Sequence, residues 1–369
     1  MATDTAAQRL RLWIPLLCGW LALLPTAHAS AAAVPYQALL LQVPGASGVL
    51  HVVASAPLDV GNPAITTAVI AIHGHSRDVM HTFQATTAAA AAASQTAHTL
   101  VVAPIFQVAE TRATRCHSPG LPATQTGDLL WTCSSWQQGA AAQNTPAIAA
   151  NMAIDMLVAH VLQQFPAVQT VTIAGFSAGG QLVQRYIGFA ALAPRPAHLR
   201  YVVGSPSSWL YFDPERPLPT RGGQTTDWAT CTADPATACE FTLALPATGS
   251  DTCPGYHQWK YGTSHWPAYG RSAAEARAAY GAADVTYLLG AQDMGTGKGA
   301  AYSVLDTTCQ AQLQGPYRLQ RGLAYAAYDN TKLAGGTHRL MAPVAGCGHD
   351  VRCVFTSDVG RAALFGTPK

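Results

Sequence analysis

Short apolar runs alternate along the chain with longer stretches that are rich in strong helix formers. Eight of these runs are predicted as strands because they are short, largely apolar and, in most cases, rich in β-branched residues. They cover residues 36–42, 49–56, 66–72, 99–104, 171–174, 201–205, 285–290 and 339–344. The later runs alternate little between apolar and polar residues, as parallel strands covered on both faces do, whereas the first two are consistent with an antiparallel edge.

Predicted helices separate these strands. They cover residues 82–97, 145–165, 178–192 and 272–281. The first of them is rich in alanine, which is the strongest helix former. Because β and α segments alternate, the predicted fold class is α/β, with one doubly wound and mostly parallel sheet.

Two segments interrupt this alternation. Residues 105–144 are loop-like and contain two cysteines and two tryptophans, and residues 206–270 are rich in Pro, Thr, Gly, Trp and Tyr and contain three cysteines. Both follow the carboxyl ends of predicted strands, where an open α/β sheet binds its ligands. We interpret them as insertions over an active site; the alternative is that they are ordinary surface loops held by disulfides.

The N-terminal segment has the pattern of a secretory signal peptide. Arg9 and Arg11 precede an apolar run of about a dozen residues, and the small residues of Ala-His-Ala follow at 27–29. Cleavage is predicted after Ala29. Residues 30–369 are then expected to form a single domain that is secreted or periplasmic.

A membrane anchor and a lipoprotein signal are the alternatives for this segment. The apolar run is shorter than the roughly 20 residues that a spanning helix needs, so no stable membrane insertion is expected after cleavage. Cys18 is preceded by Pro-Leu-Leu, which lacks the small residue expected next to a lipidated cysteine.

Removal of residues 1–29 leaves eight cysteines, and an even number in an exported chain predicts disulfides. Metal binding is the alternative, but the sequence lacks the paired Cys-x-x-Cys or His-x-x-x-His spacings that it would need. Short local loops are expected, closed by the pairs Cys347–Cys353, Cys116–Cys133 and Cys231–Cys239.

Composition and charge exclude some partners. The 369 residues include 21 basic and 19 acidic side chains, and the net charge is +2. No basic block stands out, so no nucleic-acid partner is predicted. Apolar residues make up 49% of the chain, so a sizeable buried core is expected.

One serine stands between glycines at the end of a predicted strand, in the sequence VTIAGFSAGG at 171–180. A strand that turns sharply into a helix brings its backbone so close together that side chains at Gly175 and Gly179 would collide. Ser177, at the tip of this turn, is then held in a strained conformation with its hydroxyl above the sheet. The pattern Gly-x-Ser-x-Gly in this context predicts that Ser177 is a nucleophile.

A serine nucleophile needs a histidine to take its proton and a carboxylate to orient that histidine. Among 13 histidines, His349 is the candidate because it lies in a small loop directly after the last predicted strand. Four other histidines are less suitable. His338 enters that strand from its other end, His160 lies in a helix, and His257 and His265 lie in the second insertion.

Asp293 is the predicted acid, because it lies just past the end of the strand at 285–290. Its alternative role is that of a turn former or helix cap. Asp284 precedes the same strand, Asp306 lies farther along the chain, and Asp350 is expected to point away from its neighbour.

Ser177, Asp293 and His349, in this chain order and on these strand ends, resemble the triad of the α/β-hydrolase superfamily. The resemblance covers roughly residues 36–365 and implies the α/β-hydrolase fold. The segments GFSAGGQLVQRY and GCGHD also resemble a group of exported bacterial and fungal hydrolases that are similar to polyhydroxyalkanoate depolymerases and related esterases.

The resemblance also implies an oxyanion hole. One donor is the backbone N–H of Ala178, and the second is the N–H of His75 or Ser76 in the loop after the third predicted strand. His73 and Gly74 match the His-Gly turn of the family. His73 is expected to brace this loop, since the loop must be rigid for its amides to point at the oxyanion.

Three aromatic residues of the insertions, Trp209, Tyr211 and Trp136, are candidates for substrate binding. They can line a pocket or pack the insertions onto the core, and the sequence leaves both interpretations open. Dinucleotide, Walker and metal-binding motifs do not occur in the sequence, so no cofactor and no metal is predicted.

Together these features predict a secreted serine hydrolase. It is expected to cleave carboxylic esters, in a small-molecule or polymeric substrate, through an acyl-enzyme intermediate. One alternative is a peptidase or amidase with the same triad, because the fold does not decide the substrate. The other is a catalytically silent relative that binds a ligand or partner, against which the complete triad argues.

Overall fold

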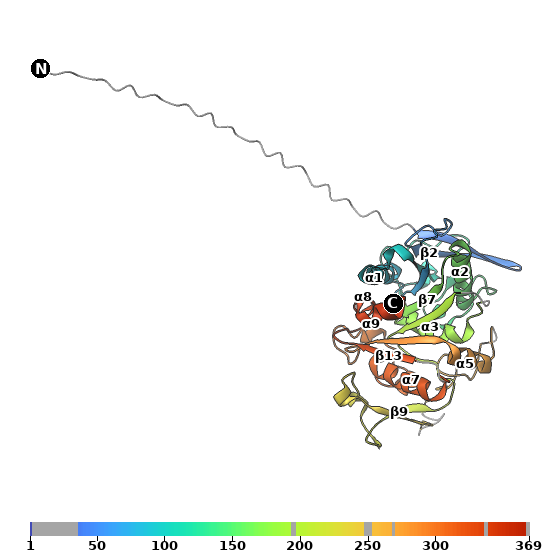
Figure 1. Ribbon diagram of the computed structural model, residues 1–369. Helices are drawn as coiled ribbons and strands as arrows, with labels where there is room; N and C mark the ends of the chain where they lie inside the picture. The colour runs from blue at the N-terminus through green and yellow to red at the C-terminus, as the bar shows by residue number, and fades with distance from the viewer. Residues whose placement is uncertain (2–35, 193–196, 247–252, 268–269, 336–338, 367–369) are drawn as a thin grey trace. The chain divides into compact units, whose positions relative to one another are not determined.

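The computed structural model describes residues 1, 36–192, 197–246, 253–267, 270–335 and 339–366 (Figure 1). Contacts between residues group Val34–Lys369 into one compact unit. The predicted signal peptide, residues 1–29, lies outside the described residues apart from Met1, and so does His338. Within the described ranges, no helix combines the length and the apolar character needed to cross a membrane.

An eight-stranded sheet forms the centre of the molecule, and each of its strands corresponds to one predicted from the sequence. The strands are β1 (Tyr36–Val43), β2 (Ala46–Ala54), β3 (Thr67–Ile72), β4 (Thr99–Ile105), β7 (Thr170–Phe176), β8 (His198–Gly204), β12 (Asp284–Gly290) and β13 (Arg339–Val344). Their order across the sheet is β1-β2-β4-β3-β7-β8-β12-β13. Strand β2 is antiparallel to β1 and β4, and the strands from β4 to β13 are parallel. The predicted mostly parallel sheet with an antiparallel edge is therefore confirmed.

Burial on both faces explains the apolar sequences of the parallel strands. Every residue of β7 after Thr170 is buried. Val171 and Ile173 belong to one core cluster, and Ala174 and Phe176 belong to a second. Because successive side chains of a strand point to opposite faces, the two clusters lie on the two faces of the sheet.

Helices cover both of these faces. The larger cluster contains side chains of α2 (Ala150–Gln164), α3 (Ala178–Phe189), α5 (Ala273–Ala282) and α7 (Arg318–Lys332). The second cluster contains side chains of α1 (Val79–Ala92), α8 (Val351–Thr356) and α9 (Asp358–Phe365). Figure 1 shows α1, α8 and α9 on one side of the sheet and α2, α3 and α5 on the other.

Three of these helices, α7, α8 and α9, are not predicted by the sequence pattern. Helix α7 has an amphipathic pattern, but it also buries the charged side chains of Arg318, Arg321 and Asp329, so its many charged residues do not mark it as a buried helix. Helices α8 and α9 have only six and eight residues, which is too short to establish a period. Helix α1 begins at Val79, before the predicted start at residue 82. It ends at Ala92, because a short 3-10 turn, η1 (Thr96–His98), occupies the end of the predicted helix.

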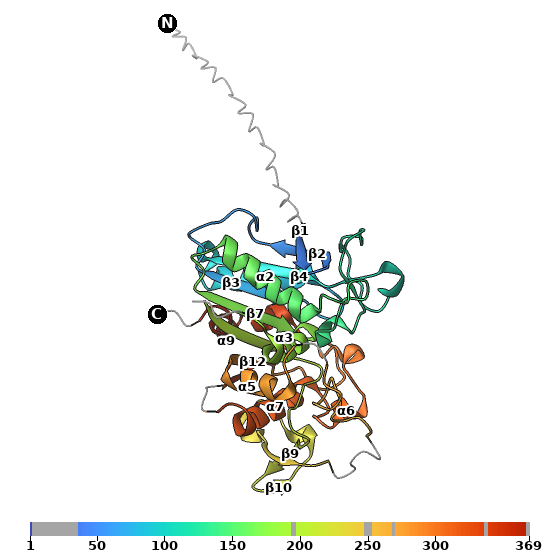
Figure 2. The same cartoon turned by 90° about the vertical axis from the view of Figure 1, so that its right-hand side faces the viewer.

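The two predicted insertions follow β4 and β8. The first contains β5 (Gln107–Val108), β6 (Leu130–Trp131), η2 (Glu110–Arg112) and η3 (Trp136–Gln138). The second contains β9 (Arg216–Arg221), β10 (Gln224–Thr225), β11 (Glu240–Ala244), η4 (Trp228–Thr230) and η5 (Pro235–Thr237). Strands β10, β9 and β11 form a small separate sheet, and Figure 2 shows β9 and β10 at the end of the molecule away from β1.

Four disulfides stabilise the loops. Three are the pairs expected from the sequence, and the fourth joins the second insertion to the short helix α6 (Cys309–Gln312), which follows η6 (Tyr302–Val304). The pairs are Cys116–Cys133, Cys231–Cys239, Cys347–Cys353 and Cys253–Cys309.

Candidate active site

Ser177 occupies a strained turn between β7 and α3, as the sequence predicts. Its backbone has φ 59° and ψ −120°, a region that costs a residue with a side chain about 1–3 kcal/mol. Two backbone hydrogen bonds hold the turn: the N–H of Ser177 donates to Gly204 at 2.9 Å, and its carbonyl accepts from Gln181 at 3.0 Å. The surrounding structure therefore holds Ser177 in a backbone conformation that is unfavourable for a residue with a side chain.

The flanking glycines are required by close backbone contacts. A Cβ added at Gly175 would lie 2.3 Å from the backbone of Gly179, and one added at Gly179 would lie 2.3 Å from the carbonyl oxygen of Ile72. Real Cβ atoms do not approach backbone atoms so closely. The Gly-x-Ser-x-Gly pattern thus reflects the packing of α3 against β7 and β3.

Asp293 and His349 are hydrogen-bonded to each other. Asp293 follows β12 and His349 follows β13, so the neighbouring carboxyl ends of these parallel strands bring together two residues that are distant in sequence. The distance from His349 Nδ1 to Asp293 Oδ2 is 2.7 Å. Their side chains are only 7% and 1% exposed, respectively, so solvent hardly competes for this bond.

The hydrogen bond also determines the state of the imidazole. Burial lowers the pKa of His349 below its usual 6.5, and the attraction of Asp293 only partly opposes this shift. The ring is therefore neutral at neutral pH. Since Nδ1 donates its proton to the carboxylate, Nε2 carries the free electron pair.

Arg318, at the start of α7, supports Asp293 from the other side. Its Nη1 lies 3.5 Å from Asp293 Oδ1, and both side chains are 1% exposed. Arg318 also donates to the carbonyl oxygens of Ala300 and Ala301, at 2.7 and 3.2 Å. Sequence reasoning missed this residue, because the many charged residues of α7 gave no sign that this helix is buried.

The loops that carry Asp293 and His349 pack tightly together. The N–H of Gln292 donates to the carbonyl oxygen of Cys347 at 2.8 Å, and the N–H of His349 donates to Gly299 at 2.7 Å. A Cβ at Gly290 would lie 2.2 Å from the carbonyl oxygen of Gly348. The disulfide between Cys347 and Cys353 closes the His349 loop.

Ser177 and His349 line one hollow of about 230 Å³. Its wall also includes Gly74, His75 and Ser76, which belong to the loop expected to supply an oxyanion donor. The ring of Phe176 packs on that of His349 with 4.8 Å between their centroids. The structure thus brings the predicted nucleophile, base and oxyanion loop to one site.

A second hollow of about 500 Å³ adjoins the first at Ser177. Ala178, the other expected oxyanion donor, lies in its wall, and His75 lines both hollows. The two spaces therefore meet at Ser177.

His73 braces the oxyanion loop. Its side chain is completely buried, its Nδ1 contacts the Gly74 carbonyl oxygen at 2.8 Å, and its Nε2 accepts from the N–H of Phe106 at 3.2 Å. Burial lowers its pKa to about 4, so the ring is neutral and can serve both partners. The carboxylate of Asp78 accepts a further bond, at 2.9 Å, from the N–H of Gly74.

The three aromatic candidates for substrate binding lie in the core instead. Trp136, Trp209 and Tyr211 are all 0% exposed, and none of them lines either hollow at Ser177. Trp209 stacks on Tyr325 at 4.4 Å between ring centroids, and Trp136 stacks on Phe106 at 5.2 Å. They pack the insertions onto the sheet, because such large rings contribute more by burial than by partial exposure.

The competing acids and histidines have other partners. Asp350 caps α8 by accepting from the N–H groups of Arg352 and Cys353 at 2.8 and 3.2 Å. Asp284 bonds to His198 at 2.8 Å, and Asp306 forms an ion pair with Lys260 at 3.0 Å. His160 lies in α2 with Nε2 3.2 Å from the carbonyl oxygen of Leu58, and His257 bonds to Thr263 at 3.1 Å.

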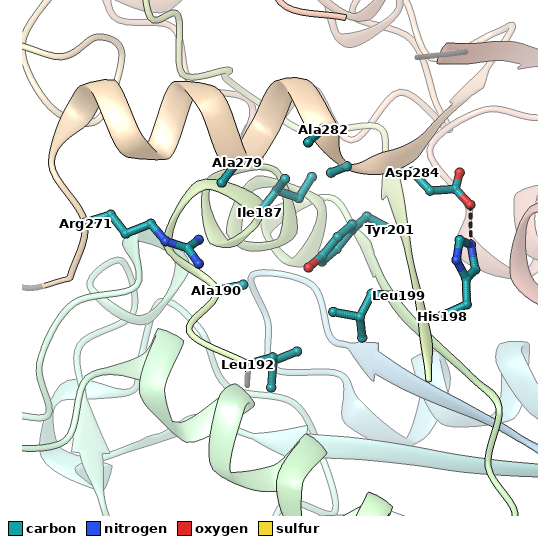
Figure 3. Close-up of a pocket in the computed structure, with 11 residues that line it drawn as sticks. Ile187, Ala190, Leu192, His198, Leu199, Tyr201, Arg271, Ala279, Ala282 and Asp284 are labelled. Atoms are coloured by element: carbon teal, nitrogen blue, oxygen red, sulfur yellow. Dashed lines mark hydrogen bonds and ion pairs between the residues drawn. The ribbon is translucent and has the colours of Figure 1, made fainter. Parts of the chain in front are cut away.

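A further hollow, of about 600 Å³, lies near the opposite ends of the strands (Figure 3). His198 and Asp284, the first residues of β8 and β12, mark its position, and Arg271 lies at its other side. No residue predicted for the active site lines it. The predicted nucleophile and base line the smaller hollow at Ser177 instead.

The sequence matches no protein-family model, and no curated protein matches it. Among solved structures it is similar to LpqC, a poly(3-hydroxybutyrate) depolymerase from Bordetella parapertussis, with a TM-score of 0.55 and 19% identity over 91% of this chain and 92% of that chain. It is also similar to poly(aspartic acid) hydrolase-1 from Sphingomonas sp. KT-1, with a TM-score of 0.53 and 18% identity over 89% of this chain and 98% of that chain.

At these identities the likeness establishes the fold. The strand order, the parallel core of the sheet and the helices on both faces define the α/β-hydrolase fold. The resemblance stated from the sequence is therefore confirmed at the level of architecture, and the chemistry has to be argued from the site.

Proposed function

We infer that this protein is a serine hydrolase that cleaves carboxylic esters through an acyl-enzyme intermediate. The observation that carries this inference is the 2.7 Å bond between His349 and Asp293, in a hollow that His349 shares with the strained Ser177. A nucleophile, a base and an orienting acid are the three parts that this chemistry requires.

The proposed reaction begins with proton transfer from Ser177 Oγ to His349 Nε2 as the oxygen attacks the ester carbonyl carbon. Asp293 stabilises the imidazolium that forms. The carbonyl oxygen gains a negative charge, which the N–H of Ala178 and the N–H of His75 or Ser76 would stabilise. His349 then protonates the leaving alcohol, and a water molecule hydrolyses the acyl-enzyme by the same steps.

The form of the substrate is part of the proposal. One similar structure bears the name of a poly(3-hydroxybutyrate) depolymerase, and because that polymer is a polyester, the name supports a polymeric as well as a small-molecule ester for the present chain. The other is named for poly(aspartic acid), a polyamide, and its name favours the amidase alternative. The two hollows of about 230 and 500 Å³ are of a size to accept one repeat unit on either side of the scissile bond.

Export is the other part of the proposal. The four disulfides support an oxidising compartment. Together with the predicted signal peptide at residues 1–29, they indicate a secreted or periplasmic enzyme.

A panel of substrates tests the reaction class. Purified protein with its disulfides intact is offered nitrophenyl esters of graded chain length, peptide nitroanilides and a polyester film, in parallel with the Ser177→Ala variant. The proposal expects ester cleavage by the wild type and none above background by the variant. Preferential cleavage of the anilides would favour the amidase alternative, and an inactive wild type of correct fold would favour a silent binding protein.

A further inference from the structure

Most of the side chains that line the larger hollow at Ser177 carry a polar group. Among the described residues that line it, only Ala178, Val304 and Leu305 have apolar side chains. A long alkyl chain placed there would cover polar groups without replacing their hydrogen bonds to water, which costs free energy. The wall therefore suits a substrate that carries its own polar or charged groups.

Three charged side chains line this hollow: Arg115, Lys260 and Asp306. Lys260 and Asp306 form an ion pair at 3.0 Å, and Asp306 also accepts from Tyr261 at 2.8 Å and Thr308 at 2.7 Å. These bonds and the charge of Lys260 hold the pKa of Asp306 at about 2. Both side chains are thus charged, but their charges cancel, so the pair as a whole attracts a charged ligand only weakly.

Arg115 is the third charged side chain of this hollow, and it is not part of the ion pair. Its side chain is exposed, and none of the residues described by the structure accepts a hydrogen bond from its guanidinium or forms an ion pair with it. The next residue, Cys116, is 1% exposed, bonded to Cys133, and its carbonyl oxygen accepts from buried Arg77 at 2.9 Å. The backbone beside Arg115 is therefore anchored while its charge faces the site.

The two hollows take different parts of an ester. His349 has to protonate the leaving alcohol, and it lines only the smaller hollow, so the leaving group belongs there and the acyl group belongs in the larger one. The smaller hollow also contains Asp78, whose pKa is lowered by its hydrogen-bonded neighbours, among them His81 and the N–H of Gly74. Arg115 lines the smaller hollow as well, but there the negative charge of Asp78 offsets it. The larger hollow has two cationic side chains, Arg115 and Lys260, against the single carboxylate of Asp306.

We propose that the preferred substrate has an acyl group bearing a carboxylate, which Arg115 binds in the larger hollow. Arginine suits this role because its planar guanidinium makes two parallel hydrogen bonds to a carboxylate. Lys260 lies in the same wall with 22% of its side chain exposed, but it is paired with Asp306, so Arg115 is the principal cation. This proposal rests on the ester hydrolysis inferred above, and it defines the class of ester.

Two matched esters test it. The first is the mono-4-nitrophenyl ester of adipic acid, and the second is the same ester with a carboxamide in place of the free carboxylate. The pair differs in charge and hardly in shape, so the ratio of their kcat/KM values measures recognition of the carboxylate. The wild type is expected to prefer the anionic ester, and the preference should fall as salt is added.

Arg115→Gln should remove this preference. The variant is expected to lower kcat/KM on the anionic ester about tenfold or more, as loss of a charged hydrogen-bonded pair does, and to leave the neutral ester within about twofold. Arg115→Lys should retain part of the preference. Arg112→Gln is the matched control, since Arg112 is an exposed arginine of the same insertion that lines neither hollow.

Two results would overturn the assignment: a wild type that favours the neutral ester, or an Arg115→Gln variant that lowers both rates by the same factor. Failure of the hydrolase itself would look different, because neither ester would then be cleaved and a fluorophosphonate would not label Ser177. Cleavage of the neutral ester at Ser177 without any charge preference would leave the hydrolase intact and refute only the role of Arg115.

Discussion

In the proposed mechanism the base depends on Asp293, whose carboxylate is hydrogen-bonded to His349 at 2.7 Å and would fix the orientation and the tautomer of its ring. Asp293→Asn is expected to lower kcat by about 10³–10⁴, the scale seen when the acid of a triad is neutralised. The variant also leaves the buried Arg318 without its anionic neighbour, so its unfolding should be measured beside its kinetics.

Asp350→Asn is the control for this change. Asp350 caps α8, and asparagine is an equally good cap, so turnover and stability should both stay close to wild type. If Asp350→Asn were the more damaging of the two substitutions, the assignment of the acid would be incorrect.

The pH dependence of the reaction follows from the environment of His349. A general base works only when it is unprotonated, and burial lowers the pKa of this imidazole below 6.5. On a neutral ester, kcat/KM should therefore rise with pH through a midpoint below 6.5. It should level off as the pH approaches neutrality, where the imidazole is fully deprotonated. A midpoint clearly above 6.5 would mean that the residue that titrates is not the buried His349 described here.

The turn at Ser177 depends on how closely α3 approaches β3. Gly179→Ala places a Cβ 2.3 Å from the carbonyl oxygen of Ile72, and a backbone atom in the centre of a sheet cannot move aside cheaply. We expect the free energy of unfolding in denaturant to fall by about 1–3 kcal/mol, as for overpacked cores. Gly297→Ala serves as the matched control, because nothing lies within 4 Å of its added Cβ; equal stability of the two variants would contradict the packing described.

The disulfide between Cys347 and Cys353 is predicted to serve catalysis more than folding. It closes a loop with a sequence separation of only 6, so it removes little entropy from the unfolded chain. The same loop carries His349, and small displacements of a base are costly in rate. Replacing both cysteines by serine should lower kcat clearly and shift Tm little.

The matched control for this pair is Cys231–Cys239, which has a sequence separation of 8 and lines neither hollow at Ser177. Its double serine variant should keep full turnover. An unchanged kcat in the Cys347 and Cys353 variant, or both thiols found free in the oxidised protein, would refute the proposed role.

At the level of elements, the sheet could be predicted from the sequence and part of the helical layer could not. The parallel strands inside the sheet are largely buried on both faces, as β3, β4 and β7 show, so their apolar, β-branched sequences are distinctive. Helix α7 buries Arg318, Arg321 and Asp329 in ion pairs and hydrogen bonds with partners that are distant in sequence. Such partners are known only once the chain is folded, so the charged sequence of α7 conceals its burial.

At the scale of the whole molecule, the fold brings the carboxyl ends of β3, β7, β12 and β13 to one edge. The oxyanion loop, Ser177, Asp293 and His349 follow these four strands in that order. The sequence predicts these positions because each lies a few residues beyond a recognisable strand. The walls of the site follow no such rule: Arg115 and Lys260 come from the two insertions, whose packing around Ser177 is decided by disulfides and buried aromatic residues.

The central claim is that Ser177 is the nucleophile, and covalent labelling tests it most directly. The oxidised protein is treated with a fluorophosphonate, and the modified residue is mapped by mass spectrometry of its peptides. The account predicts one modified residue, Ser177, with labelling lost in Ser177→Ala and strongly slowed in Asp293→Asn. Labelling of a different serine, or ester hydrolysis by a folded Ser177→Ala variant at the wild-type rate, would contradict it.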